Sequence, residues 1–142
     1  MSVLVNRRSV EIEWGDCDAA GIVFYPRYFA MFDASTAYLF EKATGMKKIA
    51  WREKFGVVGF PMVDTSARFL VPSKYGDVIE IETRVVAARR SSFDVEHRVL
   101  KGEVVAIEAK ETRVWAGPDP DRPDRIKGYP LPAELLAALG VG

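Results

Sequence analysis

Two carboxylates, Asp16 and Asp18, lie in a short polar segment, residues 15–21, that precedes the most apolar stretch of the chain. Pro26 suits the first turn of a helix, where its missing N–H has no intrahelical partner to lose. The N-terminus of that helix is a natural place for an oxyanion. Asp18 precedes Pro26 by eight residues and can meet a carbonyl compound polarised by the Tyr25 N–H. The alternative is a loop aspartate that hydrogen-bonds its own backbone.

A third carboxylate, Asp33, falls on the apolar stripe of the predicted helix. It shares this stripe with Phe29, Ala37 and Phe40. A carboxylate in such a position must be paired, protonated, or reached by solvent or a ligand. Asp33 therefore has either a partner from another segment or subunit, or a place at the deep end of a substrate pocket.

Two other residues with reactive side chains are better interpreted as packing. His97, the single histidine, lies on an apolar strand face, so a site built from several histidines is impossible. Cys17 has no basic neighbour in sequence to lower its pKa. The pattern therefore predicts no metal site.

An arginine pair, Arg89 and Arg90, interrupts a strand and is followed by two serines. Such arginines are usually solvated, but they can also bind phosphate through charge-assisted hydrogen bonds. The chain contains no P-loop and no dinucleotide-binding glycine motif.

The sequence predicts one long helix and five strands, and these elements must position the candidate residues. Alternating apolar residues predict strands over 8–14, 62–70, 78–88, 93–100 and 103–115. The long helix is expected over 26–43, buried on most sides, with Gly45 as its C-cap. A short helix is expected over 46–56, anchored by Ile49, Trp51 and Phe55, and another over 131–139. Residues 117–132 are expected to form an irregular loop.

This order predicts an α+β fold in which an antiparallel sheet wraps one helix. Residues 1–142 form a single domain by length, and a sheet with only one helix leaves an edge that favours a dimer. Twenty basic and twenty acidic residues cancel, which argues against nucleic-acid or membrane capture by charge. With no visible signal peptide or membrane span, the chain is expected to be cytoplasmic.

Residues 15–28, Gly-Asp-Cys-Asp-Ala-Ala-Gly-Ile-Val-Phe-Tyr-Pro-Arg-Tyr, resemble the signature of the 4-hydroxybenzoyl-CoA thioesterase family of hot-dog-fold proteins. The likeness continues through residues 32–35, 56–61 and 89–93, and covers most of the chain to about Trp115. It implies a five-stranded antiparallel sheet around a central helix, in a homodimer or homotetramer. It also implies hydrolysis of an acyl-CoA without any cofactor, coenzyme A being part of the substrate.

The resemblance also suggests a role for each candidate. Asp18 is similar to the catalytic carboxylate, a nucleophile or general base, and the Tyr25 N–H matches the donor that polarises the thioester carbonyl. Asp33 resembles the residue that recognises the ring hydroxyl, and Arg89 and Arg90 fall where the family binds coenzyme A phosphates.

Three other functions stay open. Pro26 stands where many relatives acting on aliphatic acyl-CoAs have histidine, which favours an aromatic substrate over a short aliphatic one. A non-catalytic acyl-CoA-binding module is the second alternative. The third is a dehydratase or hydratase, which would need a histidine paired with a carboxylate, and His97 lies in the wrong segment for that pattern. Ala19 and Ser91 depart from the family's pattern and bear on specificity and phosphate affinity.

Overall fold

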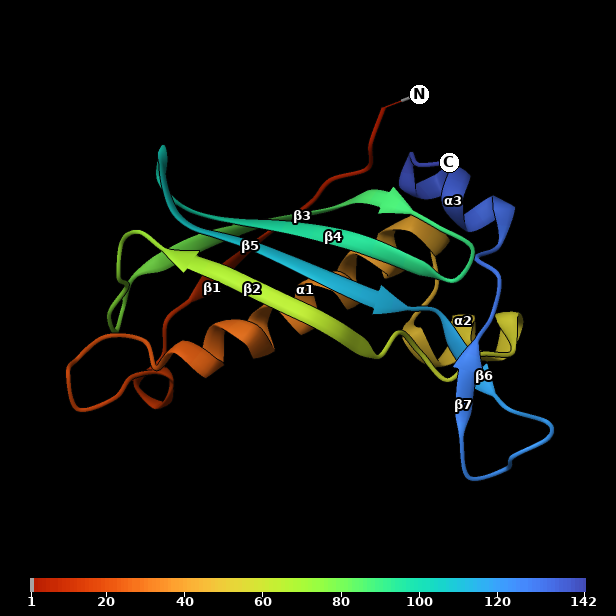
Figure 1. Cartoon of the computed structure of the whole chain (residues 1–142). Coiled ribbons are helices and arrows are strands. Elements are labelled where there is room, and N and C mark those ends of the chain that lie inside the picture. The colour runs from red at the N-terminus through yellow and green to blue at the C-terminus, as the bar shows by residue number, and fades with distance from the viewer. Residues whose placement is uncertain (1) are drawn as a thin grey trace.

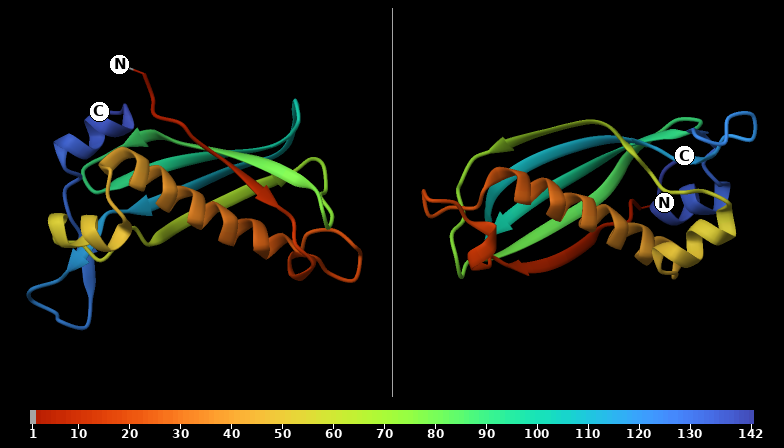
Figure 2. Two further views of the ribbon diagram at one scale, coloured as in Figure 1. Left: turned by 180° about the vertical axis from the view of Figure 1, so that it is seen from behind. Right: turned by 90° about the horizontal axis from the view of Figure 1, so that it is seen from below.

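A long helix and a five-stranded antiparallel sheet dominate the computed structural model, which describes residues 2–142. Helix α1 spans Tyr25–Thr44, and the strand order is β1-β3-β4-β5-β2. The strands are β1 Asn6–Glu11, β2 Met62–Phe69, β3 Val78–Ala88, β4 Ser92–Lys101 and β5 Val104–Val114. The sheet curves over one side of α1 (Figures 1 and 2). The predicted sheet wrapped around one helix is confirmed.

The ends of α1 agree with the sequence prediction to within one residue. Pro26 lies in the first turn, and Gly45 adopts the left-handed conformation, φ 70°, with its N–H donating to the Glu41 carbonyl. The prediction that α1 is buried on most sides is wrong for the isolated chain. Tyr25 and Tyr38 are 59% and 47% exposed, because the sheet covers only one side of the helix.

Near each end of the chain, one strand stops earlier than the sequence predicts. The first strand ends at Glu11 rather than at residue 14, because residues 14–16 form a 3₁₀ turn. The last long strand ends before Trp115, whose N–H donates to Ser91 O at 2.7 Å while its carbonyl accepts from Tyr129 N at 2.7 Å. Strand pairing therefore changes at Trp115. Beyond it, β6 Ala116–Pro118 pairs with β7 Ile126–Gly128 in a region predicted to be irregular.

Two further helices close the far end of the molecule. They are α2 Lys48–Phe55 and α3 Ala133–Leu139. Trp51 of α2 is fully buried, whereas Ile49 is 74% exposed and is not the anchor that the sequence suggested. No described helix is long and apolar enough to span a membrane.

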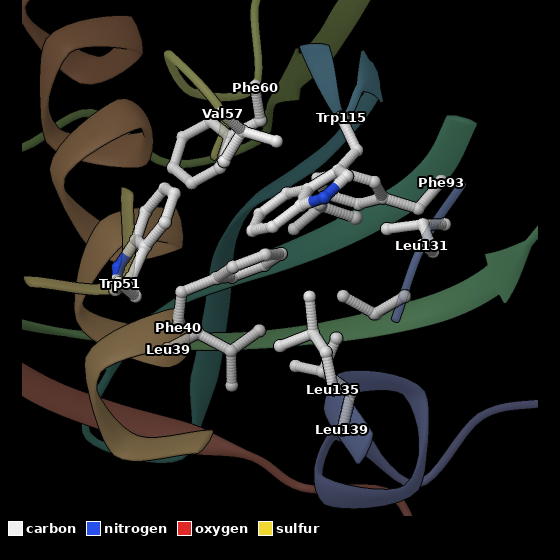
Figure 3. Close-up of a cluster of buried hydrophobic side chains, with 12 residues drawn as sticks. Leu39, Phe40, Trp51, Val57, Phe60, Phe93, Trp115, Leu131, Leu135 and Leu139 are labelled. Carbon is white, nitrogen blue, oxygen red and sulfur yellow. The ribbon is translucent and has the colours of Figure 1, made fainter. Parts of the chain in front are cut away.

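Large aromatic side chains fill the core at this end (Figure 3). Phe40 of α1 packs against Trp51, Phe60, Phe93 and Trp115, with ring centroids 5.0–6.0 Å apart. A second cluster lies under the N-terminal half of α1; its members include Ile12, Phe32, Ile79, Ile81, Val99 and Ile107. The two clusters hold α1 in a fixed position against the sheet, and so fix where its N-terminus lies.

Candidate active site

The loop before α1 is a tight hairpin held by its own backbone. Asp18 N donates to Ile22 O at 3.1 Å, and Gly21, in the left-handed region at φ 81°, donates to Asp18 O at 2.9 Å. The Asp18 side chain accepts from Ala20 N at 2.8 Å through Oδ1. The neighbouring carboxylate has a different task, since Asp16 Oδ2 accepts from Glu13 N at 2.8 Å. The local hydrogen bond expected of a loop aspartate is thus present at Asp18, and occupies one of its two oxygens.

Two hydrogen bonds tie this hairpin to the start of α1 and to the loop between β2 and β3. Phe24 N donates to Asp16 O at 2.8 Å, and Val23 N donates to Ser73 O at 2.9 Å. The first amide of the helix, that of Tyr25, donates to no acceptor within residues 2–142. An amide left open at a helix N-terminus, directly after a hairpin that carries a carboxylate, is suited to a polarised carbonyl oxygen.

Exposed aromatic rings surround this helix end. Phe69, at the end of β2, packs its ring 6.4 Å from that of Tyr25 and 6.3 Å from that of Phe29. Phe24, Tyr25 and Phe69 are each about half exposed. The helix N-terminus therefore opens onto an apolar surface rather than a purely polar one.

Asp33, about 12 Å along the helix axis from Tyr25, is paired. Its Oδ1 lies 2.8 Å from Nη2 of Arg113, which is 3% exposed. The Asp33 carboxylate itself is 63% exposed, so its other oxygen is open to solvent. Asp33 thus has the partner from another segment that was one of the two expectations, and it lies at the surface rather than at the deep end of a pocket.

Arg113 connects Asp33 to a buried polar chain under the sheet. The guanidinium donates to Glu111 Oε1 at 3.0 Å and Oε2 at 3.2 Å, and to Phe60 O at 3.1 Å. Glu111 Oε1 also accepts from Thr36 Oγ1 at 2.9 Å and lies 3.2 Å from His97 Nε2. Burial alone would raise the pKa of Glu111, but hydrogen bonds and charge from His97 and Arg113 outweigh it and lower the pKa to about 2.

His97 has the structural role that the sequence indicated. It is fully buried, its Nδ1 lies 2.8 Å from Thr83 Oγ1, and Phe32 stacks on its ring at 4.8 Å. No group of three His, Cys, Asp or Glu side chains in the described chain is placed to hold a metal ion.

Glu111 and Arg113 were missed by the sequence reasoning, although a signal was present. The apolar residues that alternate along the predicted strand 103–115 are Val105, Ile107, Ala109 and Trp115, all at odd positions. Residues 111 and 113 share their parity, and a strand alternates strictly between its two faces. Two charged residues on an inward face require partners. Glu111 and Arg113 pair with each other, Glu111 also lies against the buried His97, and Arg113 reaches out to the exposed Asp33.

The arginine pair lies far from Asp18. The Asp18 hairpin sits beside the start of β3, through the bonds Ile12 N to Asp77 O and Val23 N to Ser73 O. Arg89 follows the other end of this 11-residue strand, roughly 34 Å away at 3.4 Å per residue (Figure 1). One protomer therefore does not bring Asp18 and the arginine pair together.

The two arginines also differ from each other. Arg89 binds Asp94 through both terminal nitrogens, at 2.6 and 3.2 Å, and donates to Ser92 Oγ at 2.7 Å. The hydrogen bond with Asp94 raises the pKa of Arg89 and lowers that of Asp94. Arg90 is exposed and makes no side-chain ion pair in the described chain. Arg90 is thus the freer of the two to bind an anion.

Asp33 opens onto a surface pocket of about 380 Å³. Its other lining groups include Lys48, Phe60, Met62 and Arg113. A carboxylate, two cations and an aromatic ring thus converge on one pocket two turns along α1 from the Tyr25 amide. Such a lining suits a flat group with a polar end.

Comparison with known proteins places the chain among thioesterases. A model of the thioesterase-like superfamily matches residues 12–139. The chain is 37% identical to the 4-hydroxybenzoyl-CoA thioesterase of Pseudomonas sp. (strain CBS-3) over 133 residues, 88% of this chain and 90% of that protein. It is 34% identical over 91 residues to the 1,4-dihydroxy-2-naphthoyl-CoA hydrolase of Synechococcus elongatus, covering 62% of this chain and 64% of that protein.

Solved structures agree with this. The structure of the 4-hydroxybenzoyl-CoA thioesterase from Pseudomonas sp. strain CBS-3 matches with a TM-score of 0.85 at 33% identity, covering 94% of this chain and 98% of that one. A mutant 4-hydroxybenzoyl-CoA thioesterase complexed with 4-hydroxybenzoyl-CoA matches with a TM-score of 0.86 at 31% identity, covering 95% and 98%. The likeness therefore extends over nearly the full length of both chains.

Proposed function

The chain belongs to the thioesterase-like superfamily, and we propose that it is an acyl-CoA thioesterase that hydrolyses aromatic CoA thioesters to the free acid and coenzyme A. The observation that carries the proposal is a carboxylate hairpin held against a helix N-terminus whose first amide is open. The names of the relatives support the substrate class, since 4-hydroxybenzoyl and 1,4-dihydroxy-2-naphthoyl are both hydroxylated aromatic acyl groups.

In the proposed reaction, the Tyr25 N–H holds the thioester carbonyl oxygen and stabilises the oxyanion that develops on it. Loss of one such donor typically costs about 2.7–4 kcal/mol of transition-state stabilisation. The positive end of the α1 dipole acts on the same oxygen. No metal or redox cofactor takes part in this scheme.

Asp18 acts on the carbonyl carbon by one of two routes. As a nucleophile, its carboxylate oxygen attacks the carbon, the C–S bond breaks, and coenzyme A leaves as a thiolate that takes up a proton. Water then hydrolyses the mixed anhydride and regenerates the carboxylate. As a general base, Asp18 instead takes a proton from a water molecule that attacks the carbon directly; the C–S bond then breaks, and coenzyme A leaves as a thiolate that takes up that proton. Asp33 recognises a ring hydroxyl in both routes.

We further propose that the working unit is at least a homodimer formed along β2. This strand lies at one edge of the sheet, and Met62, Val63 and Phe69 on it are exposed. An unpaired apolar edge favours pairing with a second copy. Because Arg90 lies at the far end of β3 from Asp18, the arginine pair that binds a given coenzyme A would belong to the second copy.

The experiment that tests the reaction is thiol release from a panel of CoA thioesters. The panel contains 4-hydroxybenzoyl-, benzoyl-, phenylacetyl- and butyryl-CoA, and we expect the aryl thioesters to give the highest kcat/KM. A preference for butyryl-CoA would instead favour a short-chain aliphatic thioesterase. Silence across the panel from a folded protein that binds coenzyme A would favour a non-catalytic binding module.

A further inference from the structure

The pocket beside Asp33 contains a second polar group that the proposed reaction does not use. Lys48, the first residue of α2, lines it together with Asp33 and Phe60. The Lys48 Nζ lies 4.5 Å from the centre of the Phe60 ring. A Cβ on Gly59 would lie 3.8 Å from Nζ, so the end of Lys48 rests along the Gly59 backbone. These contacts keep the ammonium at the pocket.

Asp33 is presented to this pocket as a carboxylate with one oxygen free. Its Oδ1 accepts from Arg113, and no donor in residues 2–142 reaches its Oδ2. Arg113 cannot release Asp33 easily, because Glu111 and the Phe60 carbonyl hold the rest of the guanidinium. The free oxygen is therefore a fixed acceptor.

Lys48 is the complementary donor. Its ammonium forms no ion pair within 4 Å in the described part of the chain, although it faces Asp33 and Arg113 across the pocket. Partial burial lowers its pKa, while Asp33 opposes that effect. The pocket thus holds an acceptor and a donor, each with unused hydrogen-bonding capacity, beside an aromatic wall.

We infer that Lys48 and Asp33 form a two-point site for one phenolic oxygen of the acyl ring, with Asp33 accepting the hydroxyl proton and Lys48 donating to the oxygen. A phenolic hydroxyl has one donor and acceptor lone pairs, so it satisfies both groups at once. An unsubstituted ring would desolvate both charged groups without replacing their water, and sites of this kind reject such analogues strongly. This inference rests on the proposed function and narrows its substrates to hydroxylated aromatic acyl groups.

The test is the ratio of kcat/KM for 4-hydroxybenzoyl-CoA to that for benzoyl-CoA. Lys48→Met keeps most of the side-chain length but removes the donor, and we expect the ratio to fall about tenfold, as for the loss of a charged hydrogen bond. Lys48→Arg keeps a cation, and we expect its ratio to lie between those of Lys48→Met and the wild type. Lys47→Met is the matched control, because Lys47 pairs with Glu41 at 2.9 Å and is 80% exposed. An unchanged ratio in Lys48→Met would overturn the inference.

A binding measurement separates this inference from the proposed reaction. Titration calorimetry compares 4-hydroxyphenacyl-CoA with phenacyl-CoA, thioethers that cannot be hydrolysed at a thioester bond. We expect the wild type to prefer the hydroxylated ligand and Lys48→Met to lose about tenfold of that preference. If no thioester is turned over but this preference is found, the proposed reaction fails and the two-point site stands. If wild type and Lys48→Met preferred the hydroxylated thioether to the same degree, the two-point site would be refuted, whether or not any thioester is hydrolysed.

Discussion

The buried carboxylate of Glu111 offers the sharpest test of the energetics of the site. Glu111 is 2% exposed and accepts from Arg113 and Thr36, with His97 at 3.2 Å. Glu111→Gln preserves the shape but leaves the buried Arg113 guanidinium facing a neutral amide. Removing one partner of a buried ion pair typically costs about 3–5 kcal/mol. We expect a loss of that size in the free energy of unfolding at pH 7.

Glu111 should also make the free energy of unfolding depend on pH, in a direction that its pKa defines. The surroundings lower the pKa of Glu111 from 4.5 to about 2 in the folded state. At about 1.36 kcal/mol per pH unit, this difference corresponds to roughly 3 kcal/mol of stability. Because the folded pKa is the lower one, the contribution is fully present above pH 4.5. It is lost as the pH falls from 4.5 towards 2.

Urea unfolding at a fixed protein concentration, from pH 7 to pH 3, measures both effects. The gap between wild type and Glu111→Gln should be largest near pH 7 and narrow by about 2 kcal/mol between pH 5 and pH 3. Glu108→Gln is the matched control, because Glu108 is exposed on the opposite face of β5, and it should stay within about 0.5 kcal/mol of wild type. A gap that is the same at all pH values would refute the reasoning.

Two further predictions concern the helix end and the core. Tyr25→Pro removes the proposed oxyanion donor at a helix position that tolerates proline, so kcat should fall about 10²–10³-fold. Tyr25→Ala keeps the backbone N–H, and its kcat should fall far less. Equal losses of kcat in the two variants, measured by steady-state assays, would argue against an amide donor. Trp51→Ala empties a fully buried site stacked 5.2 Å from Trp115 and should lower the free energy of unfolding by about 3–5 kcal/mol. Ile49→Ala, at a 74% exposed position, should change it by less than about 0.5 kcal/mol in the same urea titration.

Local patterns were enough to predict the main elements of this fold. The apolar run before Gly45 and the proline at its start define α1, since a glycine C-cap and a first-turn proline act within the helix itself. Strand alternation likewise predicted the sheet and the burial of His97. These features depend on neighbours in sequence.

Features that depend on distant contacts could not be predicted in this way. The strand break at Trp115 comes from hydrogen bonds to Ser91 and Tyr129. No residue near Trp115 in sequence indicates that these bonds form. The pairing of Arg89 was missed for a different reason: Asp94 is only five residues further on, but it can bind Arg89 only once the turn between β3 and β4 has formed. Arg113, by contrast, was predictable from strand parity. What hid it was the expectation that charged residues face solvent.

The most direct test of the whole account is thiol release from 4-hydroxybenzoyl-CoA by wild type and Asp18→Asn, with Asp16→Asn as the neighbouring control. General acid–base groups typically contribute about 10²–10⁴-fold in rate, so Asp18→Asn should lose at least about 100-fold in kcat. Asp16→Asn keeps an acceptor oxygen for the Glu13 amide and should retain most activity. Near-normal turnover by a folded Asp18→Asn protein would contradict the account and remove Asp18 from the reaction.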